Sequence, residues 1–84
     1  MKAIFKIADK KFETAGFIKV GENDEYIHYI KKDVNGQWKI RLELYKNIGV
    51  RCFIHDNRKV DIVAPIEIDL LPIILRKYKE KGWR

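Results

Sequence analysis

The segment Tyr26-Ile-His-Tyr-Ile-Lys31, together with Trp38-Lys-Ile-Arg-Leu-Glu-Leu-Tyr45, decides the fold of this chain. In both runs apolar and polar residues alternate, which is the pattern of a strand with one buried face. Between them lies Asn35-Gly36, a dipeptide typical of a two-residue type I′ turn. The runs therefore predict a β-hairpin in which paired residue numbers sum to 71, with Ile27 opposite Leu44. The predicted core face carries Ile27, Tyr29, Trp38, Ile40, Leu42 and Leu44.

A third strand, Val50-Arg-Cys-Phe-Ile-His55, follows after a turn whose length the hydrophobic pattern selects. A two-residue turn at Lys46-Asn47 would place Arg51 on the core face, because a one-residue slip turns every side chain over. We therefore expect the three-residue turn Asn47-Ile48-Gly49, with its glycine in the left-handed conformation of a common hairpin loop. With that turn, the strand presents to the core Val50, Cys52 and Ile54.

Apolar residues at helical spacing mark both ends of the chain. Near the N-terminus they predict an amphipathic helix over residues 3–15, ended by Gly16 in the left-handed conformation. Near the C-terminus they predict a helix with Pro72 in its first turn and Gly82 as its stop. The inward stripe of this second helix is predicted to contain Ile68, Leu71, Ile74, Leu75, Tyr78 and Trp83.

The order of these elements predicts the fold class. Two further strands, Phe17–Val20 and Lys59–Val63, flank the others, and Val60 and Ile62 of the latter are expected to point inward. We therefore predict one α+β domain over residues 1–84, a two-layer sandwich with an antiparallel meander sheet of four to five strands. The N-terminal and C-terminal helices are expected to pack on the same face of this sheet.

Composition narrows the class of protein further. Hydrophobic residues make up 46% of the chain, which is too many for intrinsic disorder. No apolar run reaches the roughly 18 residues of a membrane helix. The segment Met1–Ala8 is interrupted by Lys6 and does not resemble a signal peptide, and the single Cys52 cannot form an internal disulfide. We therefore expect an intracellular protein without a membrane partner.

The sheet face opposite the helices carries the candidate partner-binding residues. The predicted registers place Tyr26, Tyr45 and Arg51 in one row, with Phe53 and then Arg41 in the next two rows. Tyrosine, phenylalanine and arginine together are typical of protein–protein interfaces, and they can also stack on unpaired bases and hold phosphates. Three interpretations stay open: an interface with a protein partner or a second copy, a nucleic-acid surface, or a solvated face whose aromatics cover one another.

The C-terminal helix ends in a run of cations that could contact nucleic-acid phosphates: Arg76, Lys77, Lys79, Lys81 and Arg84. The alternative is a solvated helix face whose cations compensate the helix dipole. The net charge of +6, from 18 basic and 12 acidic residues, raises the affinity for polyanions in general.

The sequence predicts no catalytic, metal or cofactor site. His28 and His55 lie two strands apart and Cys52 points to the other face, so three zinc ligands do not converge. An inward cysteine also lacks the exposed thiolate of a nucleophile. The glycines lie at turns and helix ends, not in a phosphate-binding loop, and no carboxylates are paired in an apolar pocket. We expect neither an enzyme nor a small-molecule substrate.

Three motifs carry a resemblance: Phe12-Glu13-x2-Gly16-Phe17, Tyr26-Ile27-x-Tyr29-x-Lys31, and the C-terminal set Leu71, Ile74, Lys77, Glu80, Gly82 and Trp83. With them the chain resembles a group of short, uncharacterised proteins of phages, prophages and mobile elements of Gram-positive bacteria. The resemblance implies an α+β fold and a phage or mobile-element setting in the cytoplasm of a bacterial host. It implies no known activity. Pro72 and the basic charge depart from the group.

These observations lead to one main expectation and one alternative. We expect a non-enzymatic accessory protein that binds a protein partner, or a second copy of itself, through the open sheet face. The alternative is a nucleic-acid-binding accessory protein that uses the same face and the C-terminal cations. Salt separates the two, because binding to phosphates weakens steeply with ionic strength.

Overall fold

The computed structural model describes residues 7–32, 34–35, 38–55 and 61–83. Helix α1 (Ile7–Thr14) is followed by the strands β1 (Phe17–Glu22), β2 (Tyr26–Lys32), β3 (Trp38–Tyr45), β4 (Gly49–His55) and β5 (Asp61–Val63). A short 3₁₀ turn, η2 (Ile68–Leu70), then leads directly into the last helix, α2 (Leu71–Lys81). The five strands form one antiparallel sheet in chain order, so the predicted α+β meander is confirmed.

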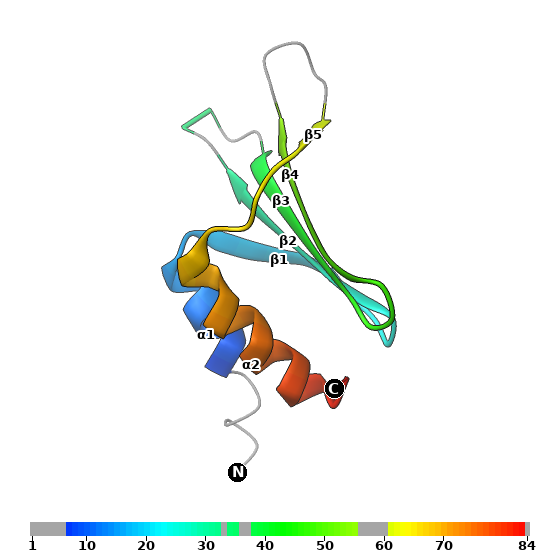
Figure 1. Cartoon of the computed structure of the whole chain (residues 1–84). Coiled ribbons are helices and arrows are strands. Elements are labelled where there is room, and N and C mark those ends of the chain that lie inside the picture. Colours follow the sequence, from blue (N-terminus) through cyan, green and yellow to red (C-terminus); the bar gives the residue numbers. More distant parts are fainter. Residues whose placement is uncertain (1–6, 33, 36–37, 56–60, 84) are drawn as a thin grey trace.

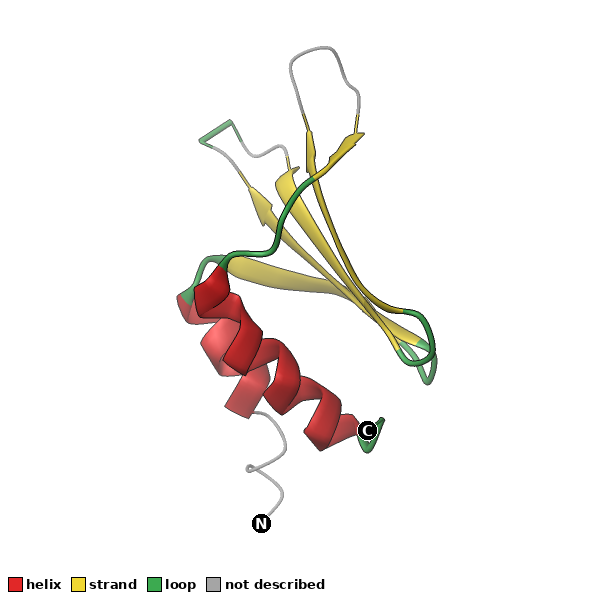
Figure 2. Cartoon of the chain, in the orientation of Figure 1, coloured by secondary structure: helices red, strands yellow, loops and turns green. Residues whose placement is uncertain are grey.

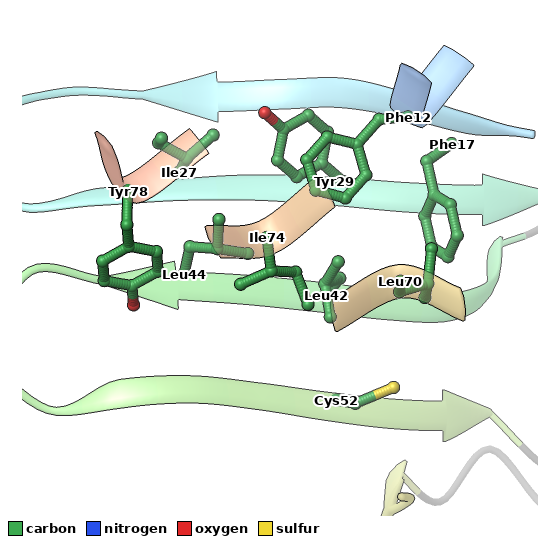
Figure 3. Packing of buried hydrophobic residues seen from close by; sticks show 10 residues of the cluster. All are labelled: Phe12, Phe17, Ile27, Tyr29, Leu42, Leu44, Cys52, Leu70, Ile74 and Tyr78. Atoms are coloured by element: carbon green, nitrogen blue, oxygen red, sulfur yellow. The ribbon is translucent and has the colours of Figure 1, made fainter. Parts of the chain in front are cut away.

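Both helices lie on the same side of the sheet, next to each other (Figures 1 and 2). Figure 3 shows how side chains from both layers meet between helices and sheet. The ring of Phe12 from α1 stacks on the ring of Tyr29 from β2, with centroids 4.1 Å apart. The buried core around this pair also includes Phe17, Ile27, Leu42, Leu44, Cys52, Leu70, Ile74 and Tyr78. None of the helices in the described part of the chain is long and apolar enough to cross a membrane.

The pairing of β2 with β3 follows the register predicted from the sequence. Ile27 pairs with Leu44 and Tyr29 with Leu42, and these four side chains are buried. The register shifts next to the loop, where Lys32 pairs with Trp38, so the predicted sum does not continue as far as the turn. Gly36 and the side chain of Trp38 lie outside the described residues.

The pairing of β3 with β4 differs from the prediction by two residues. Tyr45 pairs with Gly49 and Leu44 with Val50, so the loop between the strands is Lys46 to Ile48. Gly49 does adopt the predicted left-handed conformation, with φ of 95°, but as the first residue of β4. A two-residue shift keeps each side chain on its face, so Cys52 is buried as expected.

Helix α2 turns a different face to the core than the apolar pattern predicted. Ile74 and Tyr78 are buried as expected, and Trp83 packs against the core. The predicted members Ile68, Leu71 and Leu75 are exposed, and Lys77 is buried in their place. This rotation follows from an ion pair between Lys77 and α1, described below.

The helix ends agree with the sequence. Gly16 follows α1 with φ of 96°, and Gly82 ends α2 with φ of 73°. The amide of Gly82 bonds back to the carbonyls of Lys79 and Tyr78, so the left-handed residue satisfies the last turn. The predicted start of the first helix at residue 3, and Val60 in the last strand, fall outside the described residues.

Candidate functional site

The candidate site is the outer face of the sheet, meaning the face turned away from α1 and α2. Because Ile27, Tyr29, Leu42 and Leu44 face the helices, the residues that alternate with them point outward. The pairs on this outer face are Tyr26 with Tyr45, His28 with Glu43, Ile30 with Arg41, and Arg41 with Phe53. No helix of the described chain covers this face (Figure 2).

Three rings form a compact cluster on β2 and β3. Tyr26 stacks on His28 with ring centroids 4.4 Å apart, and the ring of Tyr45 meets His28 edge-on at 5.8 Å. A hydrogen bond of 3.3 Å joins His28 Nε2 and the hydroxyl of Tyr45. Tyr26 and Tyr45 are cross-strand partners, with centroids 6.2 Å apart. The strand pairing therefore brings together two of the five predicted partner-binding residues.

A buried carboxylate lies at the centre of the outer face. Glu43 is only 7% exposed. Its side chain is nevertheless on the outer face, and not in the core that lies between the helices and the sheet. It accepts a hydrogen bond from the hydroxyl of Tyr45 at 2.8 Å and pairs with Arg41 Nε at 2.8 Å. Burial and the bond to this carboxylate raise the pKa of Tyr45 above its usual value. The negative charge is thus held in place by groups on both sides.

Two arginines lie over the rings of the same face. The guanidinium of Arg41 is 5.1 Å from the centroid of Phe53, and that of Arg51 is 5.9 Å from the centroid of Tyr45. The predicted rows were wrong on β4, because the pairing of β4 with β3 is shifted by two residues: Phe53 stands opposite Arg41, and Arg51 opposite Glu43. The shift arises because the loop before β4 begins and ends earlier than predicted. All five predicted residues still lie on the outer face, because the shift preserves the faces.

Sequence reasoning missed the central role of Glu43. The signal was present, since Glu43 alternates with Arg41 and Tyr45 on one strand. A ring stands opposite each of the three on one neighbouring strand: His28, Phe53 and Tyr26. Exposed apolar side chains extend the face at both edges of the sheet. Ile18 on β1 is 49% exposed and Val63 on β5 is 75% exposed.

The predicted phosphate-contacting cations are placed differently. Lys77 is 4% exposed, and its Nζ lies 3.0 Å from Asp9 Oδ1. Lys81 pairs with Glu22 at 3.0 Å and lies over the ring of Trp83. Arg76 Nε lies 3.3 Å from Glu80, and Lys79 is exposed. Arg84 lies outside the described residues. Three of the predicted cations therefore have carboxylate partners within the chain.

Asp9 is the centre of an ion network between the helices and the sheet. Its carboxylate accepts a hydrogen bond of 2.6 Å from the hydroxyl of Tyr29 and contacts Lys77 and Lys19 at 3.0 Å each. Lys19 also pairs with Glu22. Burial alone would raise the pKa of Asp9, but the bonds from Tyr29, Lys19 and Lys77 outweigh it and lower the pKa to about 2. Burial and the bond to Asp9 raise the pKa of Tyr29 strongly.

This network joins four elements, α1, α2, β1 and β2, and lies away from the outer face. The pKa values of Asp9 and Tyr29 are shifted, which is common at catalytic sites and also in structural ion pairs. Here each polar atom of Asp9 points at a partner from another element, so the network holds the two helices on the sheet. Sequence reasoning missed it, although Lys77 stands at helical spacing from Ile74 and Lys81.

The remaining reactive side chains are dispersed. Cys52 is buried, and burial together with the charge of Glu67 raises the pKa of its thiol. Among the described residues, no three His, Cys, Asp or Glu side chains gather closely enough to hold a metal ion. The side chain of His55 lies outside the described part of the chain.

Comparison of the chain with models of protein families, with curated proteins and with solved structures gave no match.

Proposed function

We propose that the protein acts by binding another protein molecule, a partner or a second copy, through the outer face of its sheet, and that it is not an enzyme. The observation that carries this proposal is the cluster of Tyr26, Tyr45, Arg41, Arg51 and Phe53 around the buried Glu43. Tyrosine and arginine are the residue types that contribute most to protein–protein binding energy.

The fixed arrangement of these side chains supports binding. Ordering a long side chain on association costs about 0.5–1.5 kcal/mol. Arg41 is already held by Glu43 at 2.8 Å and by the ring of Phe53, and Tyr45 is held by Glu43. Less of this cost remains when a partner arrives. The guanidinium of Arg51 lies at the exposed side of the cluster, where it can pair with a carboxylate of the partner.

The edges of the face supply the apolar contact area. Ile18 stands opposite Ile30 on one edge, and Val63 stands opposite Phe53 on the other. The face therefore combines a polar, hydrogen-bonded centre with apolar ends. A protein surface can match this mixture by aromatic and aliphatic contacts with a few charges placed between them.

Site-specific photo-crosslinking in the bacterial host tests the proposal. A benzophenone side chain at Ile18 or Val63 should give discrete crosslinked species, because both positions border the face. These species should disappear when Phe53→Ser is added. A benzophenone at the fully exposed Val34, in the β2–β3 loop, is the matched control. Equal crosslinking from Val34, or species that survive Phe53→Ser, would contradict the proposal.

Nucleic-acid binding is the second candidate function. It is favoured by the rings of Tyr45 and Phe53 with arginines beside them on an open sheet face, and by the net charge of +6. Titration of a fluorescent single-stranded oligonucleotide at low and high salt distinguishes the two. A steep loss of affinity with salt supports phosphate contacts, whereas no binding at low salt excludes them.

We further infer a phage or mobile-element setting in the bacterial cytoplasm. The support for this setting is the resemblance carried by the motifs around Phe12, Tyr26 and Trp83, and the single cysteine of the chain. Locating the gene relative to integrases and other mobile-element genes tests it.

A further inference from the structure

The strand β4 is longer than the strand beside it. β5 pairs only with the last three residues of β4, and the amide of Ala64 adds one bond to the carbonyl of Cys52 (Figure 1). Pro65 follows, and a proline has no N–H with which to continue a ladder. The first part of β4, from Gly49 to Arg51, therefore has no neighbouring strand on this side within the described chain. We call this part the free edge of β4.

Val50 carries the unpaired backbone groups of the free edge. In an antiparallel sheet, the N–H and C=O of one residue point to the same neighbouring strand, and those of the next residue point to the opposite one. Because the carbonyl of Cys52 points towards Ala64, the N–H and C=O of Val50 point to that side as well. No described residue bonds to them there. The free edge thus offers one donor and one acceptor to an added strand.

The opposite edge of the sheet, formed by β1, is less suited to an added strand. Its pairing with β2 shifts between Lys19 and Gly21, and such a bulge interrupts a ladder and protects an edge from further pairing. The pairing of β4 with β3 runs through the free edge in one constant register. The regular backbone therefore favours β4 as the edge that accepts a strand.

Two clefts flank the free edge. One lies between α2 and the start of β4 and has a volume of about 630 Å³, and the other lies between β4 and residues 63–66 and has a volume of about 430 Å³. Their described lining is mainly apolar, and its charged members are Arg51, Arg76 and Lys79. None of the described residues that line either cleft is an aspartate or a glutamate.

Two of these three cations are available to a partner. Arg76 is paired with Glu80 at 3.3 Å, whereas Arg51 and Lys79 are exposed and form no ion pair with another described residue. The guanidinium of Arg51 lies over the ring of Tyr45 on the outer face. A segment that brings carboxylates to the free edge would neutralise both charges.

We propose that the free edge binds an extended, acidic segment of a protein partner, which adds to the sheet antiparallel to β4. The unpaired groups of Val50 select a strand, the apolar clefts select aliphatic side chains, and the free cations select carboxylates. The residue opposite Val50 would face the α2 cleft, and its two neighbours would face the side of Arg51. The segment therefore alternates aliphatic and acidic residues. This inference rests on the proposed function and names the partner segment, since Arg51 and Phe53 belong to both surfaces.

Fluorescence polarisation with a labelled peptide tests the charge of the segment. The peptide is Glu-Val-Glu-Val-Glu-Val-Glu, blocked at both ends, and the control is Lys-Val-Lys-Val-Lys-Val-Lys. A single added strand buries little area, so we expect a dissociation constant between about 10 μM and 1 mM for the acidic peptide. The basic peptide should bind at least about tenfold more weakly, because it meets like charges. Equal binding of the two would overturn the proposal.

Backbone methylation tests the strand. The valine opposite Val50 exchanges its N–H and C=O with it, so N-methylation of the valines should raise the dissociation constant about tenfold or more. N-methylation of the glutamates is the matched control, because their N–H groups point away from β4. It should change the constant by less than about threefold. Equal effects, or a larger effect at the glutamates, would overturn the antiparallel strand.

Variants and amide NMR spectra of the whole chain locate the site. Arg51→Glu should raise the dissociation constant about fivefold, because an ion pair becomes a repulsion. Lys10→Glu makes the same change of sign on the exposed side of α1 and should change it less than about twofold. The acidic peptide should shift the amide of Val50 strongly and leave Ile18 and Val20 of β1 in place. Equal effects of the two variants, or the largest shifts on β1, would overturn the proposal; circular dichroism confirms that both variants fold.

The result also separates this inference from the proposed function. A peptide that does not bind, together with crosslinks from Ile18 that Phe53→Ser still abolishes, would overturn the added strand and leave the proposed function standing. Binding at Val50 without crosslinks from Ile18 would support the added strand and contradict binding through the outer face. An eight-nucleotide oligothymidylate that shifts the same amides and binds more tightly than the peptide would overturn the proposed partner in favour of a nucleic acid.

Discussion

Replacing Asp9 with asparagine removes the carboxylate that accepts a hydrogen bond from Tyr29 and forms ion pairs with Lys77 and Lys19. The important loss is at Lys77, whose side chain is almost fully buried and whose ammonium lies 3.0 Å from Asp9. Lys19 is partly exposed and keeps its ion pair with Glu22, so the loss of its contact with Asp9 costs less stability. Asp9→Asn therefore tests how strongly a buried ion pair fixes the helices to the sheet.

Two routes give the size of the effect. The pKa of Asp9 is lowered from 3.8 to about 2. At about 1.4 kcal/mol per pKa unit, this corresponds to about 2 kcal/mol of stabilisation by the charged form. Leaving a buried charge without its partner costs about 3–5 kcal/mol. We expect Asp9→Asn to lower the free energy of unfolding by about 3 kcal/mol, out of the roughly 4–13 kcal/mol typical of a domain of 84 residues.

The same network makes stability depend on pH in a defined direction. Because the folded pKa of Asp9 lies below its unfolded value of 3.8, the folded chain binds fewer protons in acid. The stabilisation is complete above about pH 5 and is lost as the pH falls through 3.8 towards 2. The difference in unfolding free energy between wild type and Asp9→Asn should therefore shrink by about 2 kcal/mol between pH 7 and pH 2.

Urea unfolding followed by circular dichroism measures both effects. The double variant Asp9→Asn/Lys77→Met is the decisive control, because it removes the carboxylate of Asp9 together with the buried ammonium of Lys77, which would otherwise have lost its partner. We expect it to be more stable than Asp9→Asn alone by about 1 kcal/mol or more. An Asp9→Asn loss below about 1 kcal/mol, or a loss that is the same at pH 7 and pH 2, would refute the reasoning.

Two further predictions concern the end of α2 and the outer face. Gly82→Ala should lower the free energy of unfolding by about 1–2 kcal/mol, because Gly82 has φ of 73°. Gly21→Ala should cost less, because Gly21 is not left-handed and its added Cβ would lie 3.8 Å from the ring of Tyr26, an ordinary contact. Equal losses in urea unfolding would contradict this. Tyr45→Phe should cost about 1–2 kcal/mol, because it removes a donor from the buried Glu43, while Tyr26→Phe should be close to neutral. Thermal unfolding of the matched pair checks it, and a larger loss at Tyr26 would contradict it.

The β2–β3 hairpin was predictable because two signals agree on it. Alternation decides which face each residue takes, and the Asn35-Gly36 position decides the offset between the strands. At the β3–β4 hairpin only the first signal is strong. A shift of two residues buries the same side chains, so hydrophobicity cannot tell Leu44 opposite Val50 from Leu44 opposite Cys52. The backbone of the loop decides between them, with Gly49 inside the strand.

The face of α2 was mispredicted for a different reason. Hydropathy along one helix places Leu75 inside and Lys77 outside, yet the structure has the opposite. A lysine can replace a leucine in the interior where a carboxylate from another element meets it, and here Asp9 arrives from α1. That partner is far away in the sequence, so no local pattern announces it. Glu43 on the outer face differs, because its partners Arg41 and Tyr45 stand only two residues away on the same strand.

The internal ion pairs also change what the net charge of +6 means for nucleic-acid binding. Lys77, Lys81 and Arg76 are paired with carboxylates, and each such pair adds little to the field outside the protein. Among the described residues, the exposed cations that can contribute to that field include Lys10, Lys11, Lys32, Lys39 and Lys46. Among the described residues, these lysines are distributed over α1, β2, β3 and the β3–β4 loop. A polyanion would meet a diffuse field, and its binding would depend steeply on salt and hardly on any one lysine. On the aromatic outer face, Tyr45 and Arg41 contact the carboxylate of Glu43, and Arg41 lies over the ring of Phe53. This face is the more localised feature and the stronger basis for a specific partner.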